Sequence, residues 1–139
     1  MSHVTSAGMA AAGSAIGALL RQMVADAYRA VGFFGFPWDT LTVNVLGSLL
    51  IGWLAALTMD SGRLPLSPQR RLFLMGGICG GFTTFSVFSL ETVALVESGD
   101  HAMALANIGT TMLLSLGAVW VGYALGMRMS QRPLPHHRR

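Results

Sequence analysis

The sequence predicts an all-α membrane protein with four transmembrane helices. Only 11% of its 139 residues are charged and 53% are hydrophobic, whereas soluble domains average roughly a quarter charged residues. Four stretches with little or no charge are each long enough to cross the hydrocarbon core, which needs about 20 apolar residues. We expect residues 1–128 to form one transmembrane domain and residues 129–139 to form a polar, disordered C-terminal tail.

The four expected spans follow one another along the chain, separated by short connections. Glycine and proline cluster before the second and third spans, where they are typical of turns. Pairs of small residues four positions apart favour close helix packing; they are Gly13 and Gly17, Gly76 and Gly80, Gly77 and Gly81, and Gly122 and Gly126. The expected spans are residues 4–27, 40–59, 72–96 and 102–127.

The basic residues indicate membrane topology rather than nucleic-acid binding. All nine are arginines, and they lie at the ends of apolar segments and in the tail. With four spans, seven arginines fall on the side of the two termini and two on the other side. This bias favours cytoplasmic termini. Without the arginines from position 128 onward, the count is three against two.

The third span contains four glycines between positions 76 and 81, followed by Thr83 and Thr84. Each glycine disfavours a helix by about 1 kcal/mol relative to alanine, so an interruption near the middle of the membrane is one interpretation. Its freed carbonyls could hold a cation, as in the discontinuous helices of transporters. The alternative is a continuous helix that packs its glycine face on a neighbour.

Three phenylalanines follow the glycines at spacings of three, Phe82, Phe85 and Phe88. This spacing places them on one face of a continuing helix, where a packing or lipid-facing stripe is the ordinary explanation. Because the edges of aromatic rings are electropositive, the rings could instead favour a small anion in a pore.

Several polar residues lie inside the apolar spans, and each allows two interpretations. Asn44 is a helix-packing residue or an amide donor to an anion. Thr111 and Ser115 share a helix face and either form a polar track or bond to their own helix. Glu91 is a proton carrier or an acceptor for a hydroxyl such as that of Thr40.

Arg21 marks the aqueous edge of the first span or attracts anions toward a vestibule. Cys79, the only cysteine, is expected to be a buried packing residue. The sequence contains no paired carboxylates or metal-binding histidine spacing, so we expect no enzyme activity.

The run Gly80-Gly81-Phe82-Thr83-Thr84-Phe85-Ser86-Val87-Phe88-Ser89, with Glu91 two positions later, resembles the signature of the Fluc (CrcB-type) fluoride channels. The resemblance extends to residues 17–21 and 40–44 and to the layout of four spans. It implies a passive, selective fluoride channel in the inner (plasma) membrane. The channel would be an antiparallel, dual-topology homodimer with two pores and a structural Na⁺ that is not transported. The third helix of each subunit would be broken mid-membrane. Its partners would be fluoride, a second copy of the chain and the lipid bilayer, without nucleic acid.

The resemblance also implies roles for individual residues. Backbone carbonyls of Gly80 and Thr83 would hold the Na⁺. Three positions depart from the family pattern, namely Phe82, Val87 and Asn107. The anion pore would include Asn44, Phe85, Phe88, Thr111 and Ser115, and the supporting polar or vestibule residues would be Arg21, Thr40, Thr84, Ser86 and Glu91.

Two other functions are compatible with four short spans. A small proton-coupled multidrug exporter would need an acidic residue within the first span, which has none before Asp26. A non-transporting assembly subunit would use its glycine-rich surfaces to bind a partner protein.

Overall fold

The computed structural model describes residues 3–59 and 64–130, and every regular element in these two ranges is a helix. This confirms the all-α prediction. The elements are α1 (His3–Val31), α2 (Trp38–Leu57), α3 (Pro68–Arg71), η1 (Leu72–Cys79), α4 (Gly80–Phe82), α5 (Ser86–Glu97) and α6 (His101–Ser130). The elements from α3 to α4 form one continuous helical stretch, in which η1 has the wider turns of a π-helix.

Within the described residues, three helical stretches are long and apolar enough to cross a membrane: Trp38–Leu57, Pro68–Glu97 and His101–Ser130. They correspond to the second, third and fourth expected spans. The first expected span lies within α1, which has 29 residues but is not among these three. The final helix continues through Ser130, two residues into the expected tail. The rest of the tail lies outside the described residues.

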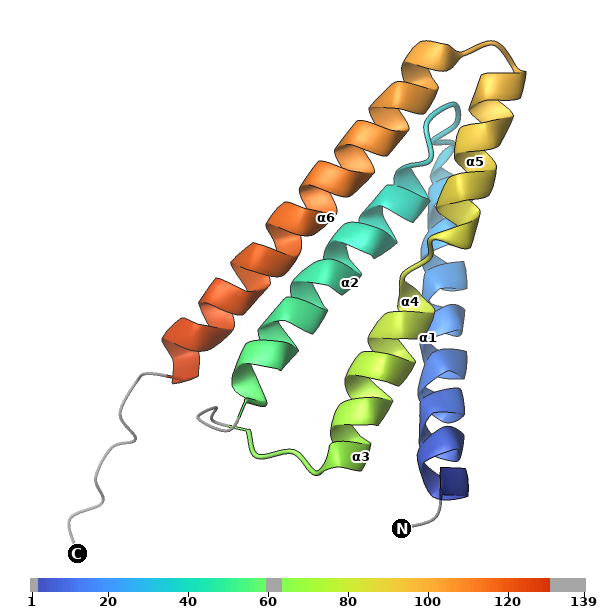
Figure 1. The fold of residues 1–139 in the computed structure, drawn as a ribbon. Coiled ribbons are helices and arrows are strands. Elements are labelled where there is room, and N and C mark those ends of the chain that lie inside the picture. The colour runs from blue at the N-terminus through green and yellow to red at the C-terminus, as the bar shows by residue number, and fades with distance from the viewer. Residues whose placement is uncertain (1–2, 60–63, 131–139) are drawn as a thin grey trace, which may run out of the picture.

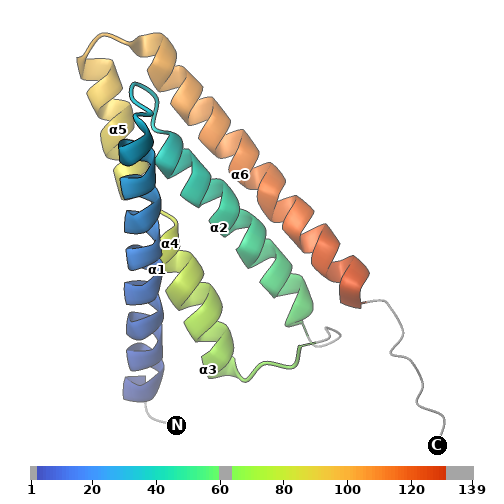
Figure 2. The same ribbon diagram turned by 180° about the vertical axis from the view of Figure 1, so that it is seen from behind.

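The helices form two groups that diverge toward the end of the molecule where both termini lie (Figure 1). The helices α2 and α6 run side by side in one group, and α1 runs beside the stretch from α3 to α4 in the other. The view from behind shows the same arrangement (Figure 2). The groups come together near α5.

Small residues allow close contact within each group, as their spacing predicts. A side chain at Gly13 would come within 2.9 Å of the Gly77 Cα atom, and one at Gly77 within 2.8 Å of the Gly13 Cα atom. Gly17 is similarly closed by the backbone of the same stretch, and Gly122 of α6 by the Leu49 carbonyl of α2. Such contacts let helix backbones approach closely without large side chains between them.

One predicted glycine pair does not pack inside the chain. A side chain at Gly80 would meet nothing nearer than the Met75 carbonyl, at 3.8 Å, and one at Gly76 would meet only a leucine side chain at 3.0 Å. This side of the third helical stretch is therefore open within one subunit. Contact with α1 therefore does not explain why positions 76 and 80 are glycines.

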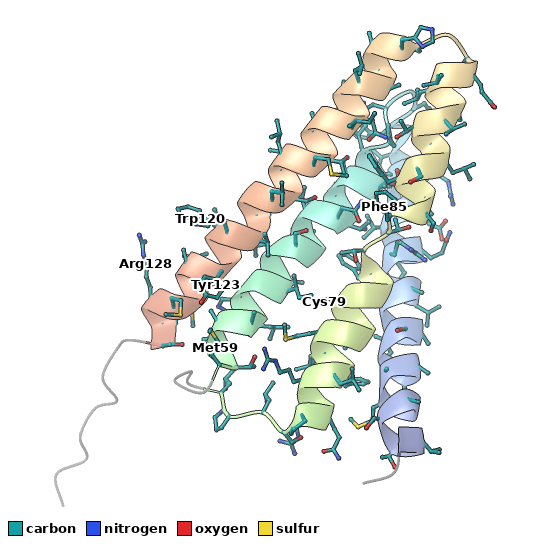
Figure 3. All side chains as sticks on the ribbon, in the orientation of Figure 1. Met59, Cys79, Phe85, Trp120, Tyr123 and Arg128 are labelled. Carbon is teal, nitrogen blue, oxygen red and sulfur yellow. The ribbon has the colours of Figure 1, made fainter. Side chains whose placement is uncertain are left out.

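Large apolar side chains cover much of the outer surface. Trp120 is 71% exposed on α6, and Phe85 is 72% exposed (Figure 3). Val43 and Asn107 are the largest fully buried side chains in the described part of the chain. Cys79 is buried and unpaired, which confirms its expected packing position. An apolar exterior around a small interior is typical of a protein whose surroundings are lipid.

Candidate functional site

The third helical stretch is interrupted between α4 and α5. Thr83 has an extended backbone, with φ −78° and ψ 160°, and helical structure resumes at Ser86. Before the interruption, the Thr83 N–H and hydroxyl both donate to the Cys79 carbonyl at 3.1 Å. The interruption therefore exists, but it lies at the threonines. The four glycines before it remain helical, and two of them, Gly77 and Gly81, pack against α1.

Asn44 of α2 holds the interruption in place. Its Nδ2 donates to the Thr84 carbonyl at 3.0 Å, and its Oδ1 accepts from the Thr84 N–H at 2.8 Å. A backbone N–H or carbonyl left unpaired in hydrocarbon costs several kcal/mol. One amide side chain thus satisfies both backbone groups of the residue that leaves the helix. The second Nδ2 hydrogen remains for another acceptor.

Thr84 also contacts the first turn of α5. Its hydroxyl accepts from the Val87 N–H at 3.1 Å, which is the usual contact of a helix-capping threonine. The same oxygen lies 3.3 Å from the Ser86 hydroxyl. The first turn of a helix carries partial positive charge and favours a nearby anion. Ser86 is exposed at this turn.

Two backbone carbonyls lose their helical donors at the interruption. In a continuous helix, the Gly80 carbonyl would accept from the Thr84 N–H and the Thr83 carbonyl from the Val87 N–H. Those N–H groups donate instead to Asn44 and to the Thr84 hydroxyl. Arg21 of α1 places its Nη1 at 3.5 Å from the Thr83 oxygen. The Gly80 carbonyl thus loses its helical donor, and the Thr83 carbonyl keeps only this long contact with Arg21 in its place. Backbone carbonyls are hard oxygen ligands of the kind that hard cations prefer.

Phe85 and Phe88 form an aromatic pair at the start of α5. Their ring centroids are 5.7 Å apart and the rings are tilted by 44°. Phe88 is only 5% exposed, whereas Phe85 is largely uncovered. The expectation that Phe82 shares a helix face with them is wrong, because the interruption separates it from α5.

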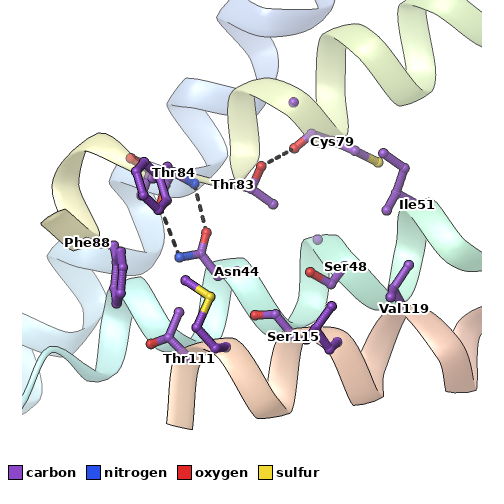
Figure 4. A pocket seen from close by; sticks show the side chains of 15 residues that line it. Asn44, Ser48, Ile51, Cys79, Thr83, Thr84, Phe88, Thr111, Ser115 and Val119 are labelled. Atoms are coloured by element: carbon purple, nitrogen blue, oxygen red, sulfur yellow. Dashed lines mark hydrogen bonds between the residues drawn. The ribbon is translucent and has the colours of Figure 1, made fainter. Parts of the chain in front are cut away.

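A cavity of about 370 Å³ lies between the two helix groups. Figure 4 shows its walls, with Asn44 from α2, Phe88 from α5, and Thr111 and Ser115 from α6 around the space. The lining also contains Gly47, Ser48 and Ile51 of α2. Eight of the residues selected from the sequence line it: Asn44, Gly80, Thr83, Thr84, Phe85, Phe88, Thr111 and Ser115.

The two α6 hydroxyls of the cavity differ in their bonding. Thr111 donates to the Asn107 Oδ1 at 3.3 Å. The Ser115 hydroxyl is buried and has no hydrogen-bond partner in the described part of the chain. Asn107 in turn donates to the Thr92 hydroxyl of α5 at 2.9 Å. Thr92 is not among the site residues expected from the sequence, although its position one turn after Phe88 was the available signal.

Glu91 and Thr40 lie apart from this cavity. The Thr40 hydroxyl donates to the Glu91 Oε1 at 2.9 Å and joins α2 to α5. Of the two interpretations of Glu91, this contact supports the role of hydroxyl acceptor. Its Oε2 has no partner among residues 3–59 and 64–130. Glu91 borders a separate cavity of about 330 Å³ beneath the loop that contains Phe33 and Phe34.

Arg21 and Ser86 border a third, open cavity of about 620 Å³ on the α1 side of the interruption. Gly80 and Thr83 line both this cavity and the one between the helix groups. The predicted vestibule residues thus lie in two places. Arg21, Thr84 and Ser86 lie at the interruption, whereas Glu91, with Thr40 bonded to it, lies beneath the loop between α1 and α2. Gly80 and Thr83, whose carbonyls lose their helical donors, thus lie between the cavity that Arg21 and Ser86 border and the main cavity.

Comparisons with known proteins identify the family of the chain. The family model described as "CrcB-like protein, Camphor Resistance (CrcB)" matches residues 8–123. "Fluoride-specific ion channel FluC 1" of Rhodopseudomonas palustris is 46% identical over 87% of this chain and 86% of its own length. The FluC proteins of Paramagnetospirillum magneticum and Rhizobium meliloti are 46% and 44% identical, over 83% and 90% of this chain and 90% and 96% of their own lengths. The chain therefore belongs to the CrcB (FluC) family, a family of ion channels and not of enzymes.

Proposed function

We propose that this protein is a passive, fluoride-selective channel of the inner (plasma) membrane. The observation that carries the proposal is the interruption held by Asn44, which brings two aromatic rings, an amide and buried hydroxyls to one cavity. The names of the relatives support fluoride as the ion. The apolar helices support a multi-pass membrane location.

An anion in the cavity would meet weak donors, because none of the lining side chains is charged. The second Nδ2 hydrogen of Asn44, the unpartnered Ser115 hydroxyl and the edges of Phe85 and Phe88 can each replace part of its hydration shell. Conduction requires binding that is weak enough for release. Chloride is larger, and a narrow passage between these groups would exclude it by size.

A single subunit leaves the proposed path incomplete. Phe85 is 72% exposed, and the face that contains Gly80 is open within one chain. An antiparallel second copy would cover these groups and form two pores related by a twofold axis. This arrangement includes α1 as a fourth span, since its 29 residues exceed the roughly 20 needed to cross hydrocarbon.

The same twofold axis would bring together the freed carbonyls of Gly80 and Thr83 from two subunits. Four such oxygens fit Na⁺, a hard cation that prefers oxygen ligands. When bound, Na⁺ would supply a fixed positive charge that holds the two interruptions together. In this proposal the ion is structural and is not transported.

The decisive experiment is fluoride efflux from proteoliposomes of the purified protein, followed with a fluoride electrode. We expect rapid efflux that is unchanged by a proton gradient, and chloride efflux at the level of protein-free liposomes. A requirement for protons, or organic-cation transport driven by them, would instead support the exporter. No flux from a folded, reconstituted protein would favour the assembly subunit.

A further inference from the structure

Asn107 connects α5 to α6 behind the wall of the main cavity. Its side chain is completely buried, with 0% exposure. It contacts Thr92 on α5 and Thr111 on α6. Of these three residues only Thr111 lines the cavity. Its direct hydrogen-bond contact with a cavity-lining residue is therefore the one with the Thr111 hydroxyl.

The directions of the hydrogen bonds follow from the backbone. The Phe88 carbonyl can only accept, so the hydroxyl proton of Thr92 is used in their 2.8 Å bond. Toward Asn107, Thr92 can then only accept, which places the Asn107 NH₂ on that side at 2.9 Å. The Asn107 oxygen consequently faces Thr111 and takes the single Thr111 proton.

The reverse orientation of the amide is unfavourable. It would bring the Asn107 oxygen against the Thr92 oxygen, with no proton between them unless the Phe88 carbonyl lost its own bond. The chain of bonds thus runs in one direction, from Thr111 to the Phe88 carbonyl. Its longest bond, 3.3 Å, is the one nearest the cavity.

We propose that Asn107 is a positioning residue that lowers the affinity of Thr111 for an anion by holding the Thr111 proton away from the cavity. If the Thr111 hydroxyl donates to an anion instead, the buried Asn107 oxygen loses its hydrogen-bond donor, which costs free energy. Ser115, one turn further along α6, has no such competing acceptor among the described residues. The inference rests on the proposed fluoride function. It makes the Thr111 hydroxyl a weaker donor to an anion than the Ser115 hydroxyl of the same cavity.

Thr92→Val tests the inference at a position that does not line the cavity. Without the Thr92 hydroxyl, the Asn107 amide is free to turn and donate to the Thr111 oxygen. The Thr111 hydroxyl can then donate to an anion without losing a hydrogen bond to Asn107. One hydrogen bond corresponds to about a fivefold change in binding. We therefore expect the half-saturating fluoride concentration of the current across planar bilayers to fall about fivefold.

The matched control is Thr92→Ser, which keeps the hydroxyl and should retain the wild-type concentration dependence. A purely structural role for Thr92 would reduce the amount of assembled protein or the maximal current and would leave the half-saturating concentration unchanged. That result, or weaker binding in Thr92→Val, overturns the inference.

If Thr92→Val does not assemble, Asn107→Leu provides the second test. It removes the acceptor for the Thr111 proton and should also lower the half-saturating concentration. An assembled Asn107→Leu with wild-type affinity overturns the inference. Absence of fluoride current in the wild type would overturn the proposed function and this inference together, whereas a conducting wild type with unaltered variants would overturn the inference alone.

Discussion

Replacing Asn44 by alanine removes both hydrogen bonds between α2 and Thr84, of 3.0 and 2.8 Å. Side-chain hydrogen bonds inside membrane proteins average about 0.6 kcal/mol and reach about 1.7 kcal/mol. Loss of two such bonds should therefore lower the free energy of unfolding by roughly 1–3 kcal/mol. Thermal unfolding of the purified protein in detergent measures this loss against the wild type.

Fluoride flux should fall further than stability alone predicts. If the free Nδ2 hydrogen donates to the passing anion, its loss removes a charge-assisted hydrogen bond of about 1.5–3 kcal/mol. A barrier higher by this amount slows flux at least about tenfold. The measurement is the initial rate of fluoride efflux from proteoliposomes, divided by the amount of assembled protein.

Asn44→Asp separates the two roles of the amide. Aspartate keeps an acceptor for the Thr84 N–H but has no donor, and its negative charge repels an anion. Its flux per assembled protein should therefore lie below that of Asn44→Ala. Wild-type flux in either assembled variant would refute the anion contact and leave Asn44 as a residue that only joins α2 to the interruption.

Three further predictions concern other parts of the site. Phe85→Ile and Phe88→Ile should each lower fluoride efflux about tenfold or more while the protein stays assembled, because isoleucine has no electropositive ring edge; unchanged efflux would contradict the role of the rings. Gly80→Val should weaken the dimer but not the fold of one subunit, since the nearest described atom outside the adjacent helix backbone, the Met75 carbonyl oxygen, lies 3.8 Å from the added Cβ. Size-exclusion chromatography, with Gly8→Val as the control for helix propensity and with or without Na⁺, tests this, and a dimer unaffected by either change would remove the cation site. Glu91→Gln should retain assembly and flux because its amide oxygen still accepts from the Thr40 hydroxyl, whereas a loss of efflux in a correctly assembled variant would indicate that the carboxylate itself takes part.

The open face of the subunit gives the glycines at 76 and 80 a different meaning from those at 77 and 81. The latter pair contacts α1, so its lack of side chains is explained inside one chain. An added Cβ at either residue of the former pair would meet no atom of a neighbouring helix within 4 Å among the described residues. The two pairs have the same spacing in the sequence, but one packs against α1 and the other lies on the surface that the proposed second copy would cover.

The sequence by itself determined the helices and their close packing. Long apolar runs without charge can satisfy their backbone groups in hydrocarbon only as helices, and glycine pairs such as Gly13 and Gly17 allow backbones to meet. In the third span it left two interpretations, an interruption or a continuous helix, because glycines and β-branched threonines weaken a helix but do not prevent one. These are local properties of neighbouring residues, so the order of residues alone carries them.

Only the tertiary structure decided where the interruption lies and which side chains surround it. The helix ends at Thr83 because Asn44, 40 residues away from Thr84, satisfies the freed backbone groups. The direction of the Thr111 hydroxyl likewise depends on Asn107 and on a carbonyl of another helix. Hydrogen bonds between distant segments form only after the helices pack, and composition and periodicity contain no information about which partners then meet.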